Sequence, residues 1–136
     1  MPGYSGTPLP KKLGLKPGSK VASTNMPADV HAELRAALAE CKVGDRELDL
    51  VHLFVKGQEE LKKAFAAWAK RLAPAGMLWV SWPKKASGVA TDLDEKKVRE
   101  IGLNAGLVDV KVCAVSDVWS GLKFVIRVKD RVAKKE

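Results

Sequence analysis

The sequence has few residues that support metal or redox chemistry. Its 136 residues include two cysteines and two histidines. Cys41 and Cys113 are far apart and form neither a CxxC motif nor a Cys/His metal-binding spacing. We therefore expect both cysteines to be reduced, buried thiols, and we predict no metal site. His52 lies inside an apolar run and is interpreted as a hydrogen-bonded core residue rather than a catalyst.

Long apolar runs are also absent from the sequence. The longest stretch without a charged residue inside the expected domain is the twelve residues 72–83. A membrane-spanning helix requires about 18 or more consecutive apolar residues. No basic segment followed by an apolar segment opens the chain, so no secretory signal is indicated. We expect a cytoplasmic protein with no membrane-spanning segment.

The formal net charge of +8 is concentrated at the two ends of the chain. Residues 1–20 carry four lysines and no acidic residue, and residues 123–136 carry six basic and two acidic residues. Residues 21–122 between them carry fourteen basic and fourteen acidic residues. A nucleic-acid-binding domain usually has its positive charge on the folded surface itself. This distribution argues against nucleic acid as a partner.

A chain of this length, with 46% hydrophobic residues, is expected to form one domain with its own core. Residues 1–18 contain four glycines and four prolines, which predicts an extended N-terminal arm. The aliphatic anchors of this arm are Leu9, Leu13 and Leu15. Residues 19–129 are predicted to form the single α/β domain, and residues 130–136 a charged tail that frays.

Hydrophobic periodicity predicts strands and helices that alternate along the chain. The predicted strands are 20–24, 48–55, 77–82, 107–115 and 122–128, and residues 42–47 are left open as a strand or a turn. Helices are predicted over 28–40, from Gly57 to about 72, and over 94–105 with Asp92 as a cap. The connection 116–121 is too short for a parallel crossover, so the last two strands are expected to pair antiparallel. The predicted fold class is α/β, with a mostly parallel sheet, helices on both faces and a C-terminal antiparallel hairpin.

Two passages resemble Rossmann-like S-adenosylmethionine methyltransferases. LGLKPGSKV at 13–21 resembles the lead-in to their first strand. LAPAGML at 72–78 resembles the passage before their fifth strand, with Ala75 in place of a glycine. Three further passages, YSGTPLPKKLG, WPKKASGVATDL and GLVDVKVCAVSDVWSGLKFV, resemble a small bacterial family of uncharacterised methyltransferase-like proteins. The resemblance covers nearly the whole chain and implies a Rossmann-like, methyltransferase-like fold without an established activity.

The first strand lacks the cofactor loop that the resemblance implies. Such methyltransferases place an acidic residue and a glycine-rich turn after this strand, because glycine lets the backbone approach the cofactor closely. This chain has VASTNMP at 21–27, and no glycine follows before Gly44. The acidic residue for the cofactor ribose has only Asp45 and Glu47 as candidates, in the segment left open above. The cofactor is therefore unknown, and S-adenosylmethionine is retained only as an alternative.

Ligands of open α/β sheets bind outside the carboxyl ends of the parallel strands. Residues 24–25, 56–57, 82–88 and 117–121 leave the predicted strands at that edge. Their side chains include hydrogen-bonding and aromatic groups that suit an anionic, partly planar ligand. The predicted ligand-binding residues are Asn25, Trp82, Lys84, Lys85, Ser87, Gly88, Trp119 and Ser120. In the competing interpretation, the two tryptophans only pack the hairpin and the lysines are solvated.

These patterns predict a noncatalytic methyltransferase-like module that binds an anionic small molecule or a protein partner at the carboxyl edge of the sheet. The alternative is an S-adenosylmethionine-dependent methyltransferase with a divergent cofactor loop. A third hypothesis is an interaction protein whose basic ends bind acidic partners. If the N-terminal arm covers the carboxyl edge, Tyr4, Ser5 and Thr7 are its natural lid residues. No catalytic residue is assigned.

Overall fold

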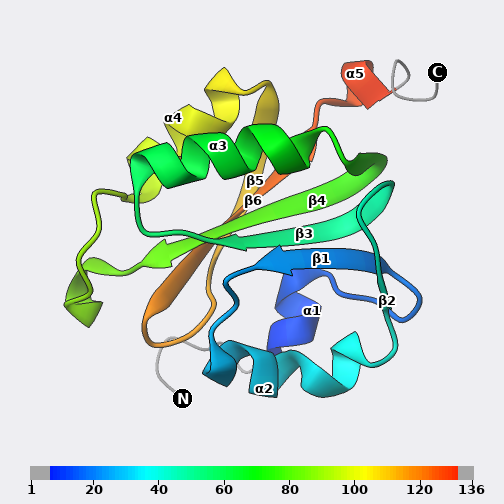
Figure 1. Cartoon of the computed structure of the whole chain (residues 1–136), viewed down its shortest axis with the longest axis horizontal. Helices are drawn as coiled ribbons and strands as arrows, with labels where there is room; N and C mark the ends of the chain where they lie inside the picture. Colours follow the sequence, from blue (N-terminus) through cyan, green and yellow to red (C-terminus); the bar gives the residue numbers. More distant parts are fainter. Residues whose placement is uncertain (1–6, 132–136) are drawn as a thin grey trace.

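A computed structural model describes residues 7–131 and contains a six-stranded sheet with helices on both faces (Figure 1). The strand order across the sheet is β2-β1-β3-β4-β6-β5. The strands are β1 (Lys20–Thr24), β2 (Lys42–Val43), β3 (Leu48–Phe54), β4 (Leu72–Pro83), β5 (Leu107–Ala114) and β6 (Trp119–Ile126). Strands β2, β1, β3 and β4 pair in parallel, whereas β6 pairs antiparallel with β4 and β5. The predicted fold class is confirmed.

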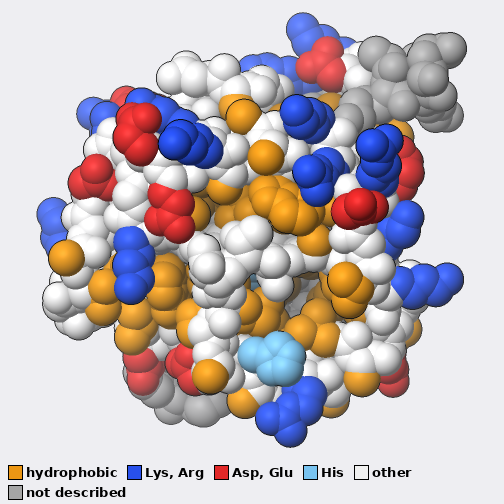
Figure 2. Space-filling model, viewed as in Figure 1, with side chains coloured by type: hydrophobic (Ala, Val, Ile, Leu, Met, Phe, Trp, Pro, Cys, Tyr) orange, Lys and Arg blue, Asp and Glu red, His pale blue; other side chains and the backbone are white. Residues whose placement is uncertain are grey.

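Helices α1 (Leu9–Leu13) and α2 (Ala28–Leu38) cover one face of the sheet, and α3 (Gln58–Ala69) and α4 (Glu95–Asn104) cover the other (Figure 1). The short helices η1 (Lys85–Ser87) and α5 (Val128–Arg131) follow β4 and β6. On the surface seen in Figure 2, acidic and basic side chains are interspersed around α3 and α4, and a hollow lined by hydrophobic side chains opens below α3. The helices on each face close a separate hydrophobic core over the sheet.

Strand β3 contributes to both cores because its side chains alternate between the two faces. Leu50 and Phe54 belong to the core under α1 and α2, whereas Val51 and Leu53 belong to the core under α3 and α4. This alternation explains the nearly continuous apolar run that identified the strand in the sequence. Strand β3 therefore lies at the centre of the fold, between β1 and β4.

The N-terminal segment corrects the prediction of an extended arm. Residues 9–13 form helix α1, whose Leu9 and Leu13 lie one turn apart and are both buried. Pro10 is accommodated in the first turn, where a helix does not need its backbone N–H. Gly14 ends the helix in the left-handed conformation, with φ 80°. Two leucines at helical spacing therefore outweigh the local preference of glycine and proline for irregular structure.

Side-chain hydrogen bonds hold α1 against the sheet. Trp79 of β4 donates its indole Nε1–H to the carbonyl oxygen of Leu13 at 2.9 Å, inside the core. Lys12 Nζ donates to the carbonyl oxygen of Ala114 at the end of β5, at 3.1 Å. Residues 9–13 are thus part of the folded unit. Tyr4 and Ser5, two of the suggested lid residues, lie outside the described residues.

Several other boundaries also differ from the prediction. The segment left open at 42–47 contains only the two-residue strand β2, and Glu47 adopts φ 52° in the turn that follows. Strand β4 begins at Leu72, with a register irregularity against β3, so residues 72–76 are not a helix end and turn. Residues 130 and 131 of the predicted tail continue α5, and residues 132–136 are outside the described part. Strand β6 begins at Trp119, inside the predicted connection.

We expect Trp79→Phe to lower the free energy of unfolding by about 1–3 kcal/mol more than Trp82→Phe does, measured by urea denaturation. Both changes remove an indole ring from β4, but only the first leaves the buried Leu13 carbonyl without its donor. No indole hydrogen bond of Trp82 occurs within residues 7–131. Equal losses for the two variants would show that the hydrogen bond does not stabilise α1.

Candidate functional site

The four segments predicted to meet at one edge of the sheet do so. Thr24 at the end of β1 pairs with Leu53, and Phe54 at the end of β3 pairs with Ser81 of β4. Pro83 at the end of β4 pairs with Trp119, which follows the turn after β5. The carboxyl ends of β1, β3, β4 and β5 therefore share the edge at which ligands of this fold class bind.

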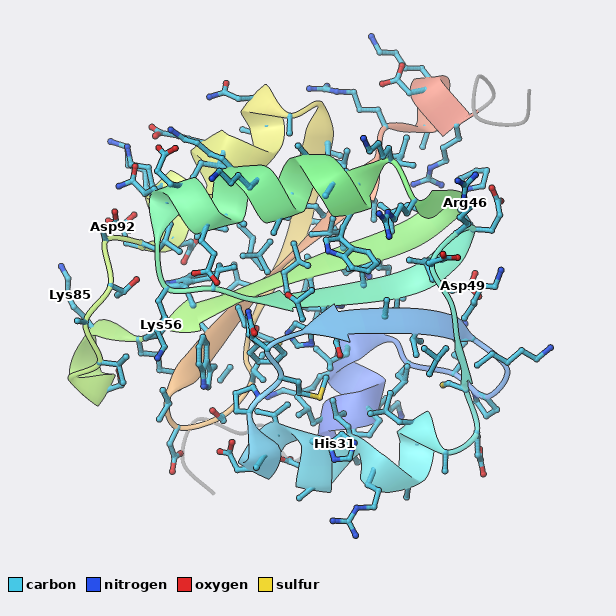
Figure 3. All side chains as sticks on the ribbon, viewed as in Figure 1. His31, Arg46, Asp49, Lys56, Lys85 and Asp92 are labelled. Atoms are coloured by element: carbon cyan, nitrogen blue, oxygen red, sulfur yellow. The ribbon has the colours of Figure 1, made fainter. Side chains whose placement is uncertain are left out.

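A hollow of about 460 Å³ lies at this carboxyl edge. Its lining residues are Asn25, Pro27, Phe54, Lys56, Glu60 and Trp119. Asn25 and Trp119 were predicted from the sequence, whereas Phe54, Lys56 and Glu60 were missed. Lys56 was part of a named strand exit, so its position was available from the sequence, but its side chain was not selected. Figure 3 shows Lys56 close to the end of β3, nearer the body of the sheet than Lys85.

The two predicted tryptophans do not face each other. Trp82 is 5% exposed and belongs to the core under α3 and α4, whereas Trp119 is 9% exposed and belongs to the core on the opposite face. The register pairs Trp82 with Ser120 and Pro83 with Trp119, so the two rings project from opposite faces of the sheet. The burial of Trp82 in this core agrees with its interpretation as a packing residue. Ser120, predicted to lie in a loop, is a half-buried residue of β6.

Ser87 and Gly88 of the turn SWPKKASG form hydrogen bonds within the turn. Ser87 Oγ donates to the carbonyl oxygen of Lys84 at 2.6 Å. Ser87 Oγ also accepts a hydrogen bond from Val89 N at 3.2 Å. The amide of Gly88 donates to the carbonyl oxygen of Lys85, with Gly88 at φ 78°. Neither Lys84 nor Lys85 lines the hollow at the carboxyl edge. The structure therefore does not bring these four predicted residues together with Asn25 and Trp119.

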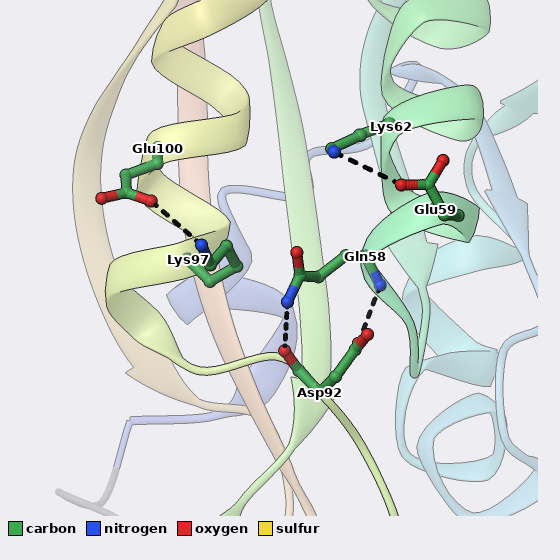
Figure 4. Close-up of polar contacts among 6 residues, drawn as sticks. All are labelled: Gln58, Glu59, Lys62, Asp92, Lys97 and Glu100. Carbon is green, nitrogen blue, oxygen red and sulfur yellow. Dashed lines mark hydrogen bonds and ion pairs between the residues drawn. The ribbon is translucent and has the colours of Figure 1, made fainter.

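The backbone amides at the starts of α3 and α2, the two helices beside the hollow, differ in their hydrogen-bond partners. At α3, Gln58 N donates to Asp92 Oδ1 at 2.8 Å and Gln58 Nε2 donates to the Asp92 carbonyl oxygen at 3.0 Å (Figure 4). Lys56 N donates to Glu60 Oε1 at 3.1 Å. Asp92 therefore does not cap α4. The N-cap of α4 is Asp94, whose Oδ1 accepts a hydrogen bond from Lys97 N.

Helix α2 begins after Pro27 without a side-chain cap. Its first backbone amides therefore remain suited to binding an anion.

The two acidic candidates for a cofactor ribose lie away from the carboxyl edge. Strand β2 pairs Val43 with Val21, three residues before β1 ends at Thr24. Asp45 and Glu47 follow β2 and line a separate hollow with Arg46 and charged residues at the end of α3. The loop after β1 contains Asn25 at φ 57°, a left-handed conformation that glycine usually adopts. One glycine-like backbone position is thus present, without the acidic partner.

His52 is the most perturbed titratable group of the described residues. Its ring is 1% exposed, stacks on Phe54 with centroids 4.2 Å apart, and its Nε2 lies 2.7 Å from Ser81 Oγ. Burial lowers the pKa of His52 to about 3, so the imidazole is neutral at pH 7. Its Nδ1 is buried and has no hydrogen-bond partner among the described residues. The prediction of a hydrogen-bonded core histidine is confirmed for one of its two nitrogens.

Residues 7–131 contain neither a metal-binding cluster nor a disulfide. This part of the chain has no group of three or more His, Cys, Asp or Glu side chains placed to bind a metal ion. Cys41 and Cys113 are free thiols as expected, but both are only partly buried, which corrects the expectation of buried cysteines. None of the helices in the described part is long and apolar enough to cross a membrane.

The fold belongs to the Rossmann-like, methyltransferase-like α/β class, as structural similarity shows. A SAM dependent methyltransferase from Aquifex aeolicus has a TM-score of 0.64 and 15% identity, with 84% of this chain and 85% of that chain covered. Magnesium protoporphyrin IX methyltransferase from Synechocystis PCC 6803, with bound SAH, has a TM-score of 0.59 and 13% identity, with 86% and 78% covered. Fibrillarin from Methanococcus jannaschii has a TM-score of 0.52 and 14% identity, with 88% and 69% covered.

Within that fold class, the sequence identifies the family. Residues 10–128 match the family described as "Protein of unknown function (DUF3052)", and the chain belongs to this family. The match spans the domain from α1 to the start of α5. No curated protein matches the chain. The structural neighbours, all at low identity, establish the fold and leave the activity of this chain to the residues of its own site.

We expect the stability of the protein to fall as the pH decreases from about 6.5 toward 3. The unfolded imidazole gains a proton below its ordinary pKa, whereas folded His52 stays neutral down to about 3. Above pH 6.5 the imidazole is neutral in both states, and His52 does not lower the free energy of unfolding. Below pH 6.5, protonation of the unfolded chain lowers the free energy of unfolding by about 1.4 kcal/mol per pH unit. Urea denaturation between about pH 4.5 and 6.5 measures this slope while the carboxylates remain charged.

The histidine variants provide the control for this slope. His52→Gln removes the titration while retaining a hydrogen-bonding side chain, so it should flatten the pH dependence. His31→Gln removes the exposed histidine of α2 and should leave the dependence unchanged. The reverse pattern would contradict the assignment of the slope to His52.

Proposed function

We propose that the protein is a noncatalytic methyltransferase-like module that binds an anionic small molecule in the hollow at the carboxyl edge. The observation that carries this proposal is the convergence of the Lys56 ammonium, the Asn25 amide and the uncapped start of α2 around one hollow. A carboxylate there would be attracted by the lysine charge and by the positive end of the α2 dipole. These groups favour an anion over a neutral or cationic ligand.

Aromatic side chains support a planar part in the same ligand. Phe54 and Trp119 line the hollow and pack edge to face, with ring centroids 5.3 Å apart and planes at 82°. Glu60 also lines the hollow, and its carboxylate accepts the backbone amide of Lys56. A second negative group near Glu60 would be repelled, so a single carboxylate on a planar body fits best. A molecule of this kind can be accommodated in a volume of about 460 Å³.

The noncatalytic part of the proposal rests on the composition of the hollow. Its described lining contains no serine, cysteine or histidine, and its one carboxylate, Glu60, accepts a backbone amide. A methyl-transferring enzyme would also need to hold its cofactor ribose, but Asp45 and Glu47 lie at the other end of β1. These features support binding without catalysis.

Two observations favour the alternative, an S-adenosylmethionine-dependent methyltransferase with a divergent loop. Asn25 adopts the left-handed backbone conformation that a cofactor-loop glycine would supply, and several structural neighbours are described as methyltransferases. We expect isothermal titration calorimetry with millimolar S-adenosylmethionine to show no saturable heat. Saturable binding that Asn25→Val abolishes would contradict the noncatalytic proposal and favour this alternative.

We expect indole-3-acetate to bind the purified protein, and Lys56→Met to weaken this binding about tenfold through loss of a charge-assisted hydrogen bond. Indole-3-acetamide, which has the same ring without the charge, should bind the unchanged protein about tenfold more weakly. Lys85→Met is the matched control, because Lys85 is exposed on η1 and does not line the hollow. Affinities from calorimetry that fall with Lys85→Met but not with Lys56→Met would place the anion at the SWPKKASG turn instead.

A further inference from the structure

A second hollow lies at the outer edge of β1, mostly on the α2 side of the sheet but reaching Trp68 of α3, and is separate from the hollow at the carboxyl edge. Its volume is about 440 Å³, within the range of cavities that hold small molecules. Most of its wall is hydrophobic, with Leu34 and Leu38 from α2, Leu50 from β3 and Met26 from the loop before α2. In Figure 2 the hollow lies beside the pale blue side chain of a histidine, and Figure 3 labels the exposed His31 on α2.

The hollow is open because β1 is only partly paired on its outer side. Strand β2 pairs with Lys20 and Val21 and then ends, so no strand within residues 7–131 neighbours the outer edge of β1 from Ala22 to Thr24. Ser23 is consequently exposed, although its pairing partner on β3, His52, is 1% exposed. Ser23 and His52 both line the hollow, which therefore extends from the open edge of β1 to the buried ring.

The polar group at the inner end of this opening is His52. Its Nε2 lies 2.7 Å from Ser81 Oγ on β4, away from β1. The two nitrogens of an imidazole point to nearly opposite sides of the ring. Nδ1 therefore faces away from β4. This nitrogen is buried without a partner, and His52 is part of the wall of the hollow.

The chemistry of the wall selects an uncharged ligand. None of the lysine, arginine, aspartate or glutamate side chains within residues 7–131 lines the hollow. Burial keeps His52 neutral, so a charged ligand would find no opposite charge at the inner end of the hollow. The Ser81 hydroxyl can either donate to Nε2 or accept from it, so Nδ1 can present a lone pair or a proton. A hydroxyl group on the ligand would match either state.

We propose that this hollow is a second ligand site, for an uncharged and mostly apolar molecule with one hydrogen-bonding group that contacts His52 Nδ1. The wall buries the apolar body of the molecule, and the open edge of β1 at Ser23 is its entry. The site differs from the hollow at the carboxyl edge in position and in the charge of the ligand. It therefore stands or falls independently of the function proposed for that edge.

The test uses 1-naphthol as the probe, with naphthalene and 1-naphthoate as matched compounds without the hydroxyl and with a negative charge. Methyl-resolved NMR titration of the full-length protein reports the site through Met26, Leu34 and Leu38. We expect 1-naphthol to shift these methyl signals saturably, and both matched compounds to bind there about tenfold more weakly. His52→Phe should remove the advantage of 1-naphthol over naphthalene.

A cavity-filling variant keeps the proposal testable if His52→Phe does not fold. Leu38→Trp, at a half-buried wall position, should weaken both uncharged probes at least about tenfold, whereas Leu103→Trp on the exposed side of α4 should change nothing. The proposal is overturned if 1-naphthol causes no saturable shift of these methyl groups, or if 1-naphthoate binds there equally well. It is also overturned if the methyl signals shift with protein concentration alone, which would mean that a second copy of the chain fills the hollow.

Discussion

Strand β2 pairs with β1 over two residues only, after which the chain turns away toward β3. An unpaired strand edge presents free backbone N–H and C=O groups, and natural sheets usually cover or shorten it. Here the edge of β1 is neither covered by a strand nor closed by α2, so Ser23 is exposed and a hollow extends to His52. The same early ending of β2 keeps Asp45 and Glu47 away from the carboxyl edge. The short β2 thus explains both the apolar hollow and the absence of Asp45 and Glu47 from the carboxyl edge.

The remainder of the fold is closely packed around β3 and β4. A Cβ atom added to Gly102 of α4 would overlap the ring of Phe124, so α4 can approach β6 closely only with glycine at this position. On the opposite face, the Trp79 indole fixes the end of α1 through the Leu13 carbonyl. Interiors packed in this way transmit local changes and leave few voids. The two hollows that we propose as ligand sites lie beside strand ends, one next to the end of β2 and the other at the carboxyl edge of the sheet.

The sequence predicted the elements that depend on hydrophobic periodicity and on connection length, namely the central strands, the main helices and the hairpin. It also located the carboxyl edge, because strand direction determines that position. It failed for α1, where two buried leucines outweigh glycine and proline, and it did not predict that Trp82 and Trp119 lie on opposite faces of the sheet. The face of the sheet on which each ring lies depends on the exact register of its strand. A shift of one residue would move the ring to the other face. The hydrogen-bonding groups of Ser87 and Gly88 were identified correctly, but local turn bonds already use them.

The two hollows share one aromatic neighbour. Phe54 lines the hollow at the carboxyl edge, packs edge to face against Trp119, and stacks on His52, which lines the other hollow. Contact of this kind couples two sites only where the shared element has two alternative arrangements that the ligands favour differently. Phe54 is 2% exposed and contacts both the His52 ring and the Trp119 ring, and no second arrangement of this side chain is observed among the described residues. The shared ring therefore separates the two hollows, whose described linings have no residue in common, so the anionic and the uncharged ligand that we propose would contact different groups.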